Sequence, residues 1–261
     1  MNFDFTSADQ RQVLGELQAQ GYTLLGYKGA LGPNQISVGV PTWFAVPFGH
    51  IFGSATIDYT PTYKVYVSNK ANIAAGTTID MDAMSFETGL GNALTFNQDG
   101  SFSSGGVLNV PASSIGLFNN RPAGTPQVTV GLAGLVNTPN GEEFLPFCAF
   151  TLNPQSSLIM TPLENILLVA AQLNLQSGNV QANLAAPGCT FTFGTSVLDY
   201  DLKVLDSTFQ ITNVPGTTSV TPVASGNLVS IVNSTSSASS AISNVSNISS
   251  ISSKSIASST R

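Results

Sequence analysis

Charged side chains are scarce in this sequence. Of its 261 residues, 14 are Asp or Glu and 8 are Lys or Arg, so charged residues make up 8% of the chain, whereas roughly 25% is usual for soluble domains. The polar part of the surface must therefore consist mainly of Ser, Thr, Asn and Gln. Because such a surface repels copies of itself only weakly, the composition favours close packing against other subunits, or an extracellular protein.

Basic clusters, metal-binding motifs and catalytic motifs are also missing. The net charge is −6 and Lys and Arg form no cluster, which argues against nucleic-acid binding. Cys148, Cys189 and the single histidine, His50, do not supply the ligands of a zinc site, and no G-x-S-x-G motif occurs. The two cysteines form one disulfide or remain buried thiols, and their low density favours thiols. We therefore expect no enzyme activity and no cofactor, with His50 hydrogen-bonded in a loop or acting as a proton-sensitive contact.

The sequence has no recognisable targeting segment. Its first residues include Asp4 and Asp9 and lack an apolar run, unlike a secretory signal peptide. No stretch of about 18 apolar residues predicts a transmembrane helix. We expect synthesis in the cytosol without a signal peptide, followed by incorporation into an assembled particle, with a virion favoured, or by display on an extracellular surface.

The order of the elements predicts an all-β fold. Residues 1–21 are expected to form a short N-terminal helix, because Thr6 or Ser7 is suited to cap it and Gly21 to end it. From residue 22 to about residue 223, alternating apolar and polar residues predict many short strands. The motifs "QDG", "PNG" and "SGN" predict hairpin turns. The expected architecture is an antiparallel β-sandwich of the jelly-roll type.

The number of strands leaves the domain count open. The Pro- and Gly-containing segment 118–127 is a candidate joint, so residues 22–121 and 122–224 form two stacked sandwiches or the two halves of one large sandwich. Residues 161–178 combine helical spacing of apolar residues with an alternating end, and they predict a short helix or a strand.

Residues 225–261 form a serine-rich tail with apolar residues at every third position. These are Ile242, Val245, Ile248 and Ile251. Because serine and asparagine are poor helix formers, the pattern suits a segment that becomes ordered only against another surface. A disordered polar tail is the competing interpretation.

Two pairs of carboxylates occur at i, i+2 spacing: Asp80 with Asp82, and Asp199 with Asp201. In a strand, this spacing places both side chains of a pair on one face. We expect a solvent-exposed face of each strand, with a calcium site as one alternative and catalysis by paired carboxylates as another.

An uncharged aromatic stretch surrounds the only tryptophan. Trp43, Phe44, Phe48 and Phe52 lie within residues 29–57, which carry no formal charge. Prolines interrupt the stretch and no flanking cluster of Lys or Arg accompanies it, which argues against insertion into a membrane. We expect these four side chains to be buried in the core or against a neighbouring subunit. Membrane contact and stacking of a glycan on Trp43 are the alternatives.

Together these features predict a non-enzymatic structural protein that assembles with itself and with other subunits, as in a virion capsid, coat or tail or a surface layer. Two alternatives remain. One is a membrane-active, pore-forming β-protein, and the other is a carbohydrate-binding β-sandwich.

Overall fold

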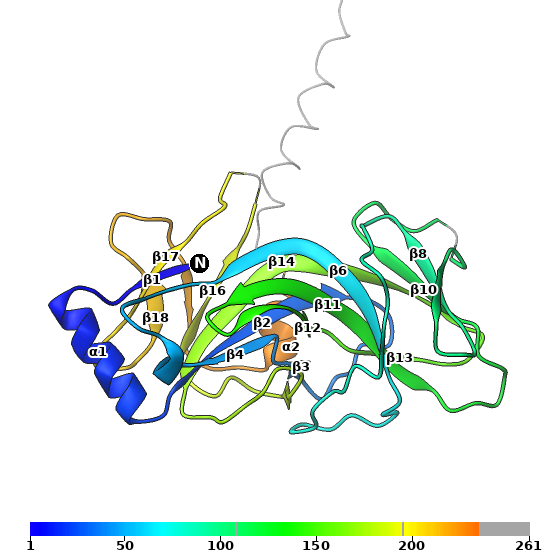
Figure 1. The fold of residues 1–261 in the computed structure, drawn as a ribbon, viewed down its shortest axis with the longest axis horizontal. Helices are drawn as coiled ribbons and strands as arrows, with labels where there is room; N and C mark the ends of the chain where they lie inside the picture. Colours follow the sequence, from blue (N-terminus) through cyan, green and yellow to red (C-terminus); the bar gives the residue numbers. More distant parts are fainter. Residues whose placement is uncertain (108, 195, 235–261) are drawn as a thin grey trace, which may run out of the picture.

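The computed structural model describes residues 1–107, 109–194 and 196–234, and they form a mainly β protein with several sheets (Figure 1). The predicted N-terminal helix is confirmed as α1 (Ala8–Ala19), with Ser7 in extended conformation as its N-cap. Gly21 follows the helix with φ +69°, a conformation that glycine adopts without strain. The helix buries Val13, Leu14 and Leu17 against the sheets.

The largest sheet is built around one long strand, β14 (Ser157–Ala171). Its first part pairs with β10, whereas its second part lies between β16 and β2. The ambiguous segment 161–178 is therefore strand as far as Ala171. Its helical spacing was misleading because the strand is buried on both faces. The other strands of this sheet are β2 (Thr23–Leu31), β4 (Phe44–Pro47), β8 (Ala93–Phe96), β9 (Phe102–Ser104), β10 (Ile115–Asn119), β16 (Gly188–Thr192) and β19 (Thr221–Val223).

A second sheet of five strands is centred on the pair β6 and β11, which arch over the molecule in Figure 1. The "PNG" motif forms the predicted hairpin between β11 and β12, and "QDG" forms another between β8 and β9. Residues 77–86 alternate between apolar and polar side chains as a strand does, yet only the two residues of β7 in this segment belong to a named strand. The members of the sheet are β6 (Asp58–Ser68), β7 (Ala83–Met84), β11 (Val128–Thr138), β12 (Gly141–Pro146) and β13 (Phe150–Leu152).

The remaining elements are short strands and helices outside the two central sheets. The first strand, β1, pairs with β17 although about 200 residues separate them. The "SGN" motif does not make a hairpin, because the strand after it, β15, pairs with β3 instead. These elements are β1 (Asn2–Asp4), β3 (Val40–Pro41), β5 (Ser54–Thr56), β15 (Val180–Gln181), β17 (Asp201–Val204), β18 (Ile211–Asn213), the 3-10 helix η1 (Phe48–His50) and the helix α2 (Leu228–Val232).

Most strand pairs are antiparallel, as predicted, but β1–β17 and β8–β10 are parallel. A parallel pair needs a crossover connection, and between β8 and β10 this connection contains β9. Strands from the two sequence halves also pair directly, since β6 pairs with β11 and β2 pairs with β14. The candidate joint 118–127 links β10 in one sheet to β11 in the other.

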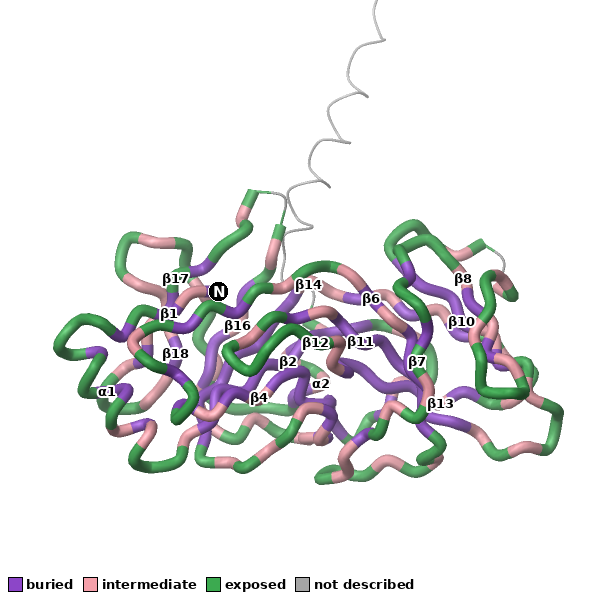
Figure 2. Tube along the Cα trace, in the orientation of Figure 1, coloured by how far each residue is buried: buried purple, intermediate pink, exposed green. Residues whose placement is uncertain are grey.

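The buried apolar residues form three clusters, because both central sheets are covered on both faces. The main cluster lies between them and includes Val65 and Val67 of β6 together with Ile166 and Leu168 of β14. The outer face of β14 packs against α2, whereas Tyr66 of β6 belongs to a third cluster. Figure 2 shows these buried positions along β2, β14, β6 and β11. Cys148 and Cys189 are both free and buried, which confirms the thiol interpretation.

No helix among the described residues has both the length and the apolar character needed to cross a membrane.

Candidate functional site

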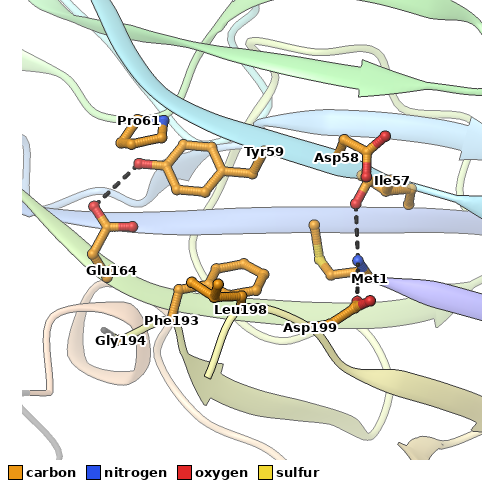
Figure 3. Close-up of a pocket in the computed structure, with 10 residues that line it drawn as sticks. All are labelled: Met1, Ile57, Asp58, Tyr59, Pro61, Glu164, Phe193, Gly194, Leu198 and Asp199. Carbon is orange, nitrogen blue, oxygen red and sulfur yellow. Dashed lines mark hydrogen bonds and ion pairs between the residues drawn. The ribbon is translucent and has the colours of Figure 1, made fainter. Parts of the chain in front are cut away.

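A pocket of about 520 Å³ opens between the start of β6, the middle of β14 and the segment that links β16 to β17 (Figure 3). Most of its wall is apolar or aromatic, and three carboxylates also line it. The lining residues are Met1, Ile57, Asp58, Tyr59, Pro61, Glu164, Phe193, Gly194, Leu198 and Asp199.

A lysine with no exposed side-chain surface lies behind the Tyr59 wall of this pocket. The Nζ atom of Lys28, on β2, is 3.3 Å from Oε2 of Glu164 and 4.4 Å from the centre of the Tyr59 ring. It also donates a hydrogen bond to the carbonyl of Leu163. The β2–β14 register shifts between Pro162 and Ile166, so Leu163 and Glu164 lie in the irregular part of the strand, where Lys28 reaches them.

Burial changes the proton affinity of this lysine. Loss of hydration lowers the pKa of Lys28 to about 8, and the Glu164 carboxylate opposes that fall. A lysine with a lowered pKa is the kind that can act as a nucleophile or base. Here Tyr59 and Glu164 separate it from the pocket and its side chain has no exposed surface, so a ligand in the pocket does not reach the amine. The arrangement is therefore a buried ion pair that supports the wall.

Two tyrosines hold the other oxygen of Glu164. The hydroxyl oxygens of Tyr59 and Tyr63 are 2.6 Å apart, and each is 3.1 Å from Oε1 of Glu164. The register between β6 and β11 shifts at Pro61, which bends the strand between the two tyrosines. Burial is the main cause that raises the pKa of each tyrosine; the neighbouring Tyr63 and then Glu164 add to it at Tyr59, and Glu164 adds to it at Tyr63, so the hydroxyls remain protonated donors. Both oxygens of Glu164 are therefore occupied.

The two other carboxylates lie at the mouth of the pocket. Asp199 accepts hydrogen bonds from the amide of Asn2 at 2.9 Å and from the Met1 amine at 3.4 Å. Burial raises the pKa of Asp199, but these hydrogen bonds and the amine charge outweigh it, so that the pKa is lowered overall. The side chain of Asp58 is exposed and makes no hydrogen bond or ion pair with any described residue. In the part of the chain that the structure describes, Lys28 pairs with Glu164 and the Met1 amine with Asp199, whereas Asp58 has no ion-pair partner.

The pocket offers two kinds of surface to a ligand. Its walls offer apolar and aromatic surface, and its mouth offers the negative charge of Asp58. Ligands that combine an apolar body with a positively charged group match both features.

The first carboxylate pair does not lie in a strand. Asp80 forms an ion pair with Lys70 at 2.6 Å, and both side chains are exposed. Asp82 accepts a hydrogen bond from the backbone N–H of Asn69 at 2.8 Å. Both residues stabilise the loop before β7, and the expectation of a shared strand face was wrong here.

The second pair is bridged by an amide. The Asn2 side chain donates to Asp199 and to Asp201, at 2.9 and 3.2 Å, so the two carboxylates do share one side of the chain. Among the described residues, no group of three or more His, Cys, Asp or Glu side chains could hold a metal ion. Calcium binding by Asp80, Asp82, Asp199 or Asp201 remains a prediction.

The aromatic stretch supplies part of the core. Trp43, Phe44 and Phe48 are at most 1% exposed, so they contact neither lipid nor a neighbouring subunit. Trp43 donates a hydrogen bond to Gly134, and its ring lies 5.3 Å from that of Tyr59. It therefore supports the pocket wall from behind, and a glycan cannot stack on it. Phe52 differs, because it is 82% exposed, so the expectation of burial in the core was wrong for this residue and burial against a neighbouring subunit remains a prediction.

Two other predicted features have different outcomes. The nitrogen Nδ1 of His50 is 2.9 Å from the side-chain oxygen of Asn140 in an exposed loop contact, which agrees with the expected structural role. The four apolar tail residues lie outside the described residues: Ile242, Val245, Ile248 and Ile251.

Sequence reasoning missed Lys28, Tyr59, Tyr63 and Glu164. One signal was present, because Lys28 is a single charge within an otherwise apolar strand and so requires a partner once it is buried. The partner itself is 136 residues away, and only the β2–β14 register brings the two together.

Comparisons with protein families, curated proteins and solved structures find no match for this chain.

Proposed function

We propose that this chain is a non-enzymatic structural subunit that assembles with copies of itself and with other subunits into a larger particle. The observation that carries this proposal is a set of large apolar side chains exposed on a surface with few charges. They are Leu31, Val38, Phe52, Met84, Phe86, Leu90 and Leu198.

Three of these side chains belong to one short segment, residues 83–90, which we call the β7 edge. Met84 is 43% exposed, Phe86 is 50% exposed and Leu90 is 42% exposed. Strand β7 is the last strand on its side of the five-stranded sheet. An edge strand presents unpaired backbone groups, and apolar side chains beside it favour association with another chain. The β7 edge is therefore our candidate contact between subunits.

The packing of the sheets supports the finer fold proposal, a β-sandwich of the jelly-roll type. The main core cluster lies between the β6–β11 sheet and the β2–β14 sheet, as the two layers of a sandwich require. Pairing of strands across residues 121 and 122 favours one large sandwich over two stacked ones. Jelly rolls of this kind are common in viral capsids, and a virion is therefore the favoured location, with an extracellular surface layer as the alternative.

The low charge content supports the same proposal. A surface of hydroxyl and amide groups loses less hydration energy on association than a charged surface does. Aromatic and Met side chains are enriched in the cores of interfaces, where charged side chains are depleted. The β7 edge has this composition except for Glu87, which is exposed.

The test is the mass of the purified chain in solution, measured by multi-angle light scattering across a range of concentrations. We expect the parent to form oligomers or particles and Phe86→Ser to shift association to concentrations about tenfold higher. Glu87→Gln, in the same segment, is the matched control and should behave like the parent. A parent that stays monomeric at all concentrations would refute the proposal, whereas an unchanged Phe86→Ser would remove the β7 edge from it.

A further inference from the structure

The pocket beside Glu164 combines two properties that a ligand must match. Its wall is apolar where Ile57, Phe193 and Leu198 face the opening, and Leu198 is 79% exposed although it is a large apolar residue. Its mouth is negatively charged through Asp58. Burying Leu198 would be favourable, and so would placing a cation beside Asp58.

The described part of the chain ends close to this pocket. Helix α2 packs on β2 and β14, and a Cβ atom added at Gly29 would lie 2.2 Å from the carbonyl oxygen of Val232. The amide of Asn165 then donates to the carbonyls of Ile231, Val232 and Ser234, the last at 3.4 Å. Asn165 is the neighbour of Glu164 in β14. Because neighbouring side chains of a strand point to opposite faces, Ser234 lies with α2 on the outer face of β14, whereas Glu164 faces the pocket on the inner side.

The sequence that follows has the complementary chemistry. Residues 235–261 contain Lys254 and Arg261 and no acidic residue, whereas all 14 acidic residues of the chain lie before residue 235. Their apolar residues recur at intervals of three, from Ile242 to Ile251. The segment thus offers apolar side chains and positive charge to a pocket that has apolar walls and negative charge.

We propose that residues 235–261 bind in the pocket of their own chain, with isoleucine side chains against Phe193 and Leu198 and Lys254 near Asp58. The segment is long enough to bring its isoleucines to the pocket, because the eight residues from Ser234 to Ile242 span up to about 26 Å when extended. The short connection also gives the segment a millimolar effective concentration at its own pocket. This favours the same chain over a second copy and offsets the entropy lost when a serine-rich segment becomes ordered.

The test uses the full chain and a fluorescent peptide with the sequence of residues 235–261, whose binding is followed by anisotropy. In the parent, the attached segment competes for the pocket, so the peptide should bind weakly. In a full-length variant with Ile242, Val245, Ile248 and Ile251 all changed to Ser, the attached segment should no longer occupy the pocket. We call this the vacated variant. We expect this variant to bind the peptide at least about tenfold more tightly than the parent does.

Two further substitutions in the vacated variant locate the binding site. Leu198→Ser and Asp58→Asn change exposed side chains of the pocket, and each should weaken peptide binding by about five- to tenfold. Phe86→Ser and Glu87→Gln are the matched changes at the β7 edge and should leave binding unchanged. A peptide with the same composition in scrambled order should bind weakly to every variant.

Each of the following outcomes would overturn the proposal. If the parent and the vacated variant bind the peptide with equal affinity, the segment does not occupy its own pocket. The same conclusion follows if peptide binding links copies of the parent and so increases its mass. Failure of the vacated variant to bind, or binding indifferent to Leu198→Ser and Asp58→Asn, would overturn the pocket as the site. The result does not depend on assembly, because it is measured on the mass-verified monomer fraction.

Discussion

Two aromatic regions of this molecule differ in what their sequences suggested and in what they do. The stretch around Trp43 attracts attention because it is uncharged and rich in Phe, yet three of its four aromatic side chains are ordinary core. The pocket around Tyr59 attracts no attention in the sequence, yet the Lys28–Glu164 ion pair and the Tyr59–Tyr63 pair support its wall and the Asp58 carboxylate lines it. The comparison shows that unusual local composition indicates burial, whereas the pocket arises where distant strands place unlike groups together.

The two regions are in contact, which sharpens the comparison. The Trp43 ring packs against the ring of Tyr59, at 86° and with 5.3 Å between centroids, and Lys28 lies over the Tyr59 ring. The core region therefore fixes the position of a side chain that forms the pocket wall. We expect substitutions in the core and in the ion pair behind the pocket to affect folding, and substitutions of the exposed pocket residues Asp58 and Leu198 to affect binding of residues 235–261. The predictions below run from the largest expected effect to the smallest.

The largest effect is expected for Trp43→Ala. Removing a fully buried tryptophan leaves a cavity, and such changes cost about 3–5 kcal/mol of unfolding free energy. Phe52→Ala removes an aromatic ring from the same stretch, but the ring is 82% exposed, so we expect a change within about 0.5 kcal/mol. Urea unfolding measures both. Similar losses for the two variants would contradict the assignment of Trp43 to the core and Phe52 to the surface.

A smaller loss is expected when the ion pair behind the pocket is broken. Glu164→Gln leaves the charge of Lys28 buried without its partner, and breaking a fully buried pair costs about 3–5 kcal/mol. Because the Glu164 side chain is 35% exposed, water offsets part of this, and we expect about 2 kcal/mol. The double variant Lys28→Met/Glu164→Gln removes both charges and should recover more than half of the loss. Additive losses in urea unfolding would argue against a direct pairing.

The sequence alone predicted those parts of the fold whose signals are local. Helix α1 was predictable from its cap, its apolar spacing and its terminal glycine, and two hairpins were predictable from "QDG" and "PNG", because these signals are local. The pairing of β1 with β17, the shift in the β2–β14 register and the contact of Lys28 with Glu164 depend on residues far apart in the chain. Asp80 and Asp82 show the opposite error, because a pattern suited to a strand falls in a loop.

Lys28 should also give the pocket region a dependence on pH that the Trp43 region lacks. Its folded pKa of about 8 lies below the ordinary value of 10.5, so between these values the unfolded chain binds more protons than the folded chain. Stability contributed by this group is therefore lowest below pH 8 and rises as the pH increases. Between pH 8 and pH 9.5 we expect a gain of about 1.5 kcal/mol relative to Lys28→Met.

The comparison with Lys28→Met is needed because other groups act in the opposite direction. Burial raises the pKa of the Cys148 and Cys189 thiols to about 12. The unfolded chain loses these protons first, and rising pH lowers stability through them. Both proteins carry the thiols, so their contribution largely cancels in the difference. Parallel pH profiles for the parent and Lys28→Met, measured by thermal unfolding, would contradict a lowered pKa for Lys28.

The smallest effect is expected at the Asp80 and Asp82 pair, which lies outside both aromatic regions. Asp80 and Lys70 are both exposed, and exposed ion pairs contribute about 0–1 kcal/mol. Asp80→Asn should therefore lower the unfolding free energy by no more than about 0.5 kcal/mol.

A bound calcium ion would behave differently, because it would add about 2.7 kcal/mol at a hundredfold excess over its dissociation constant. Thermal unfolding of the parent with calcium and with a chelator separates the two interpretations. We expect coincident curves, since Lys70 and Asn69 already hold the Asp80 and Asp82 oxygens. A midpoint raised by calcium in the parent but not in Asp80→Asn/Asp82→Asn would place an ion in this loop and give these carboxylates a binding role.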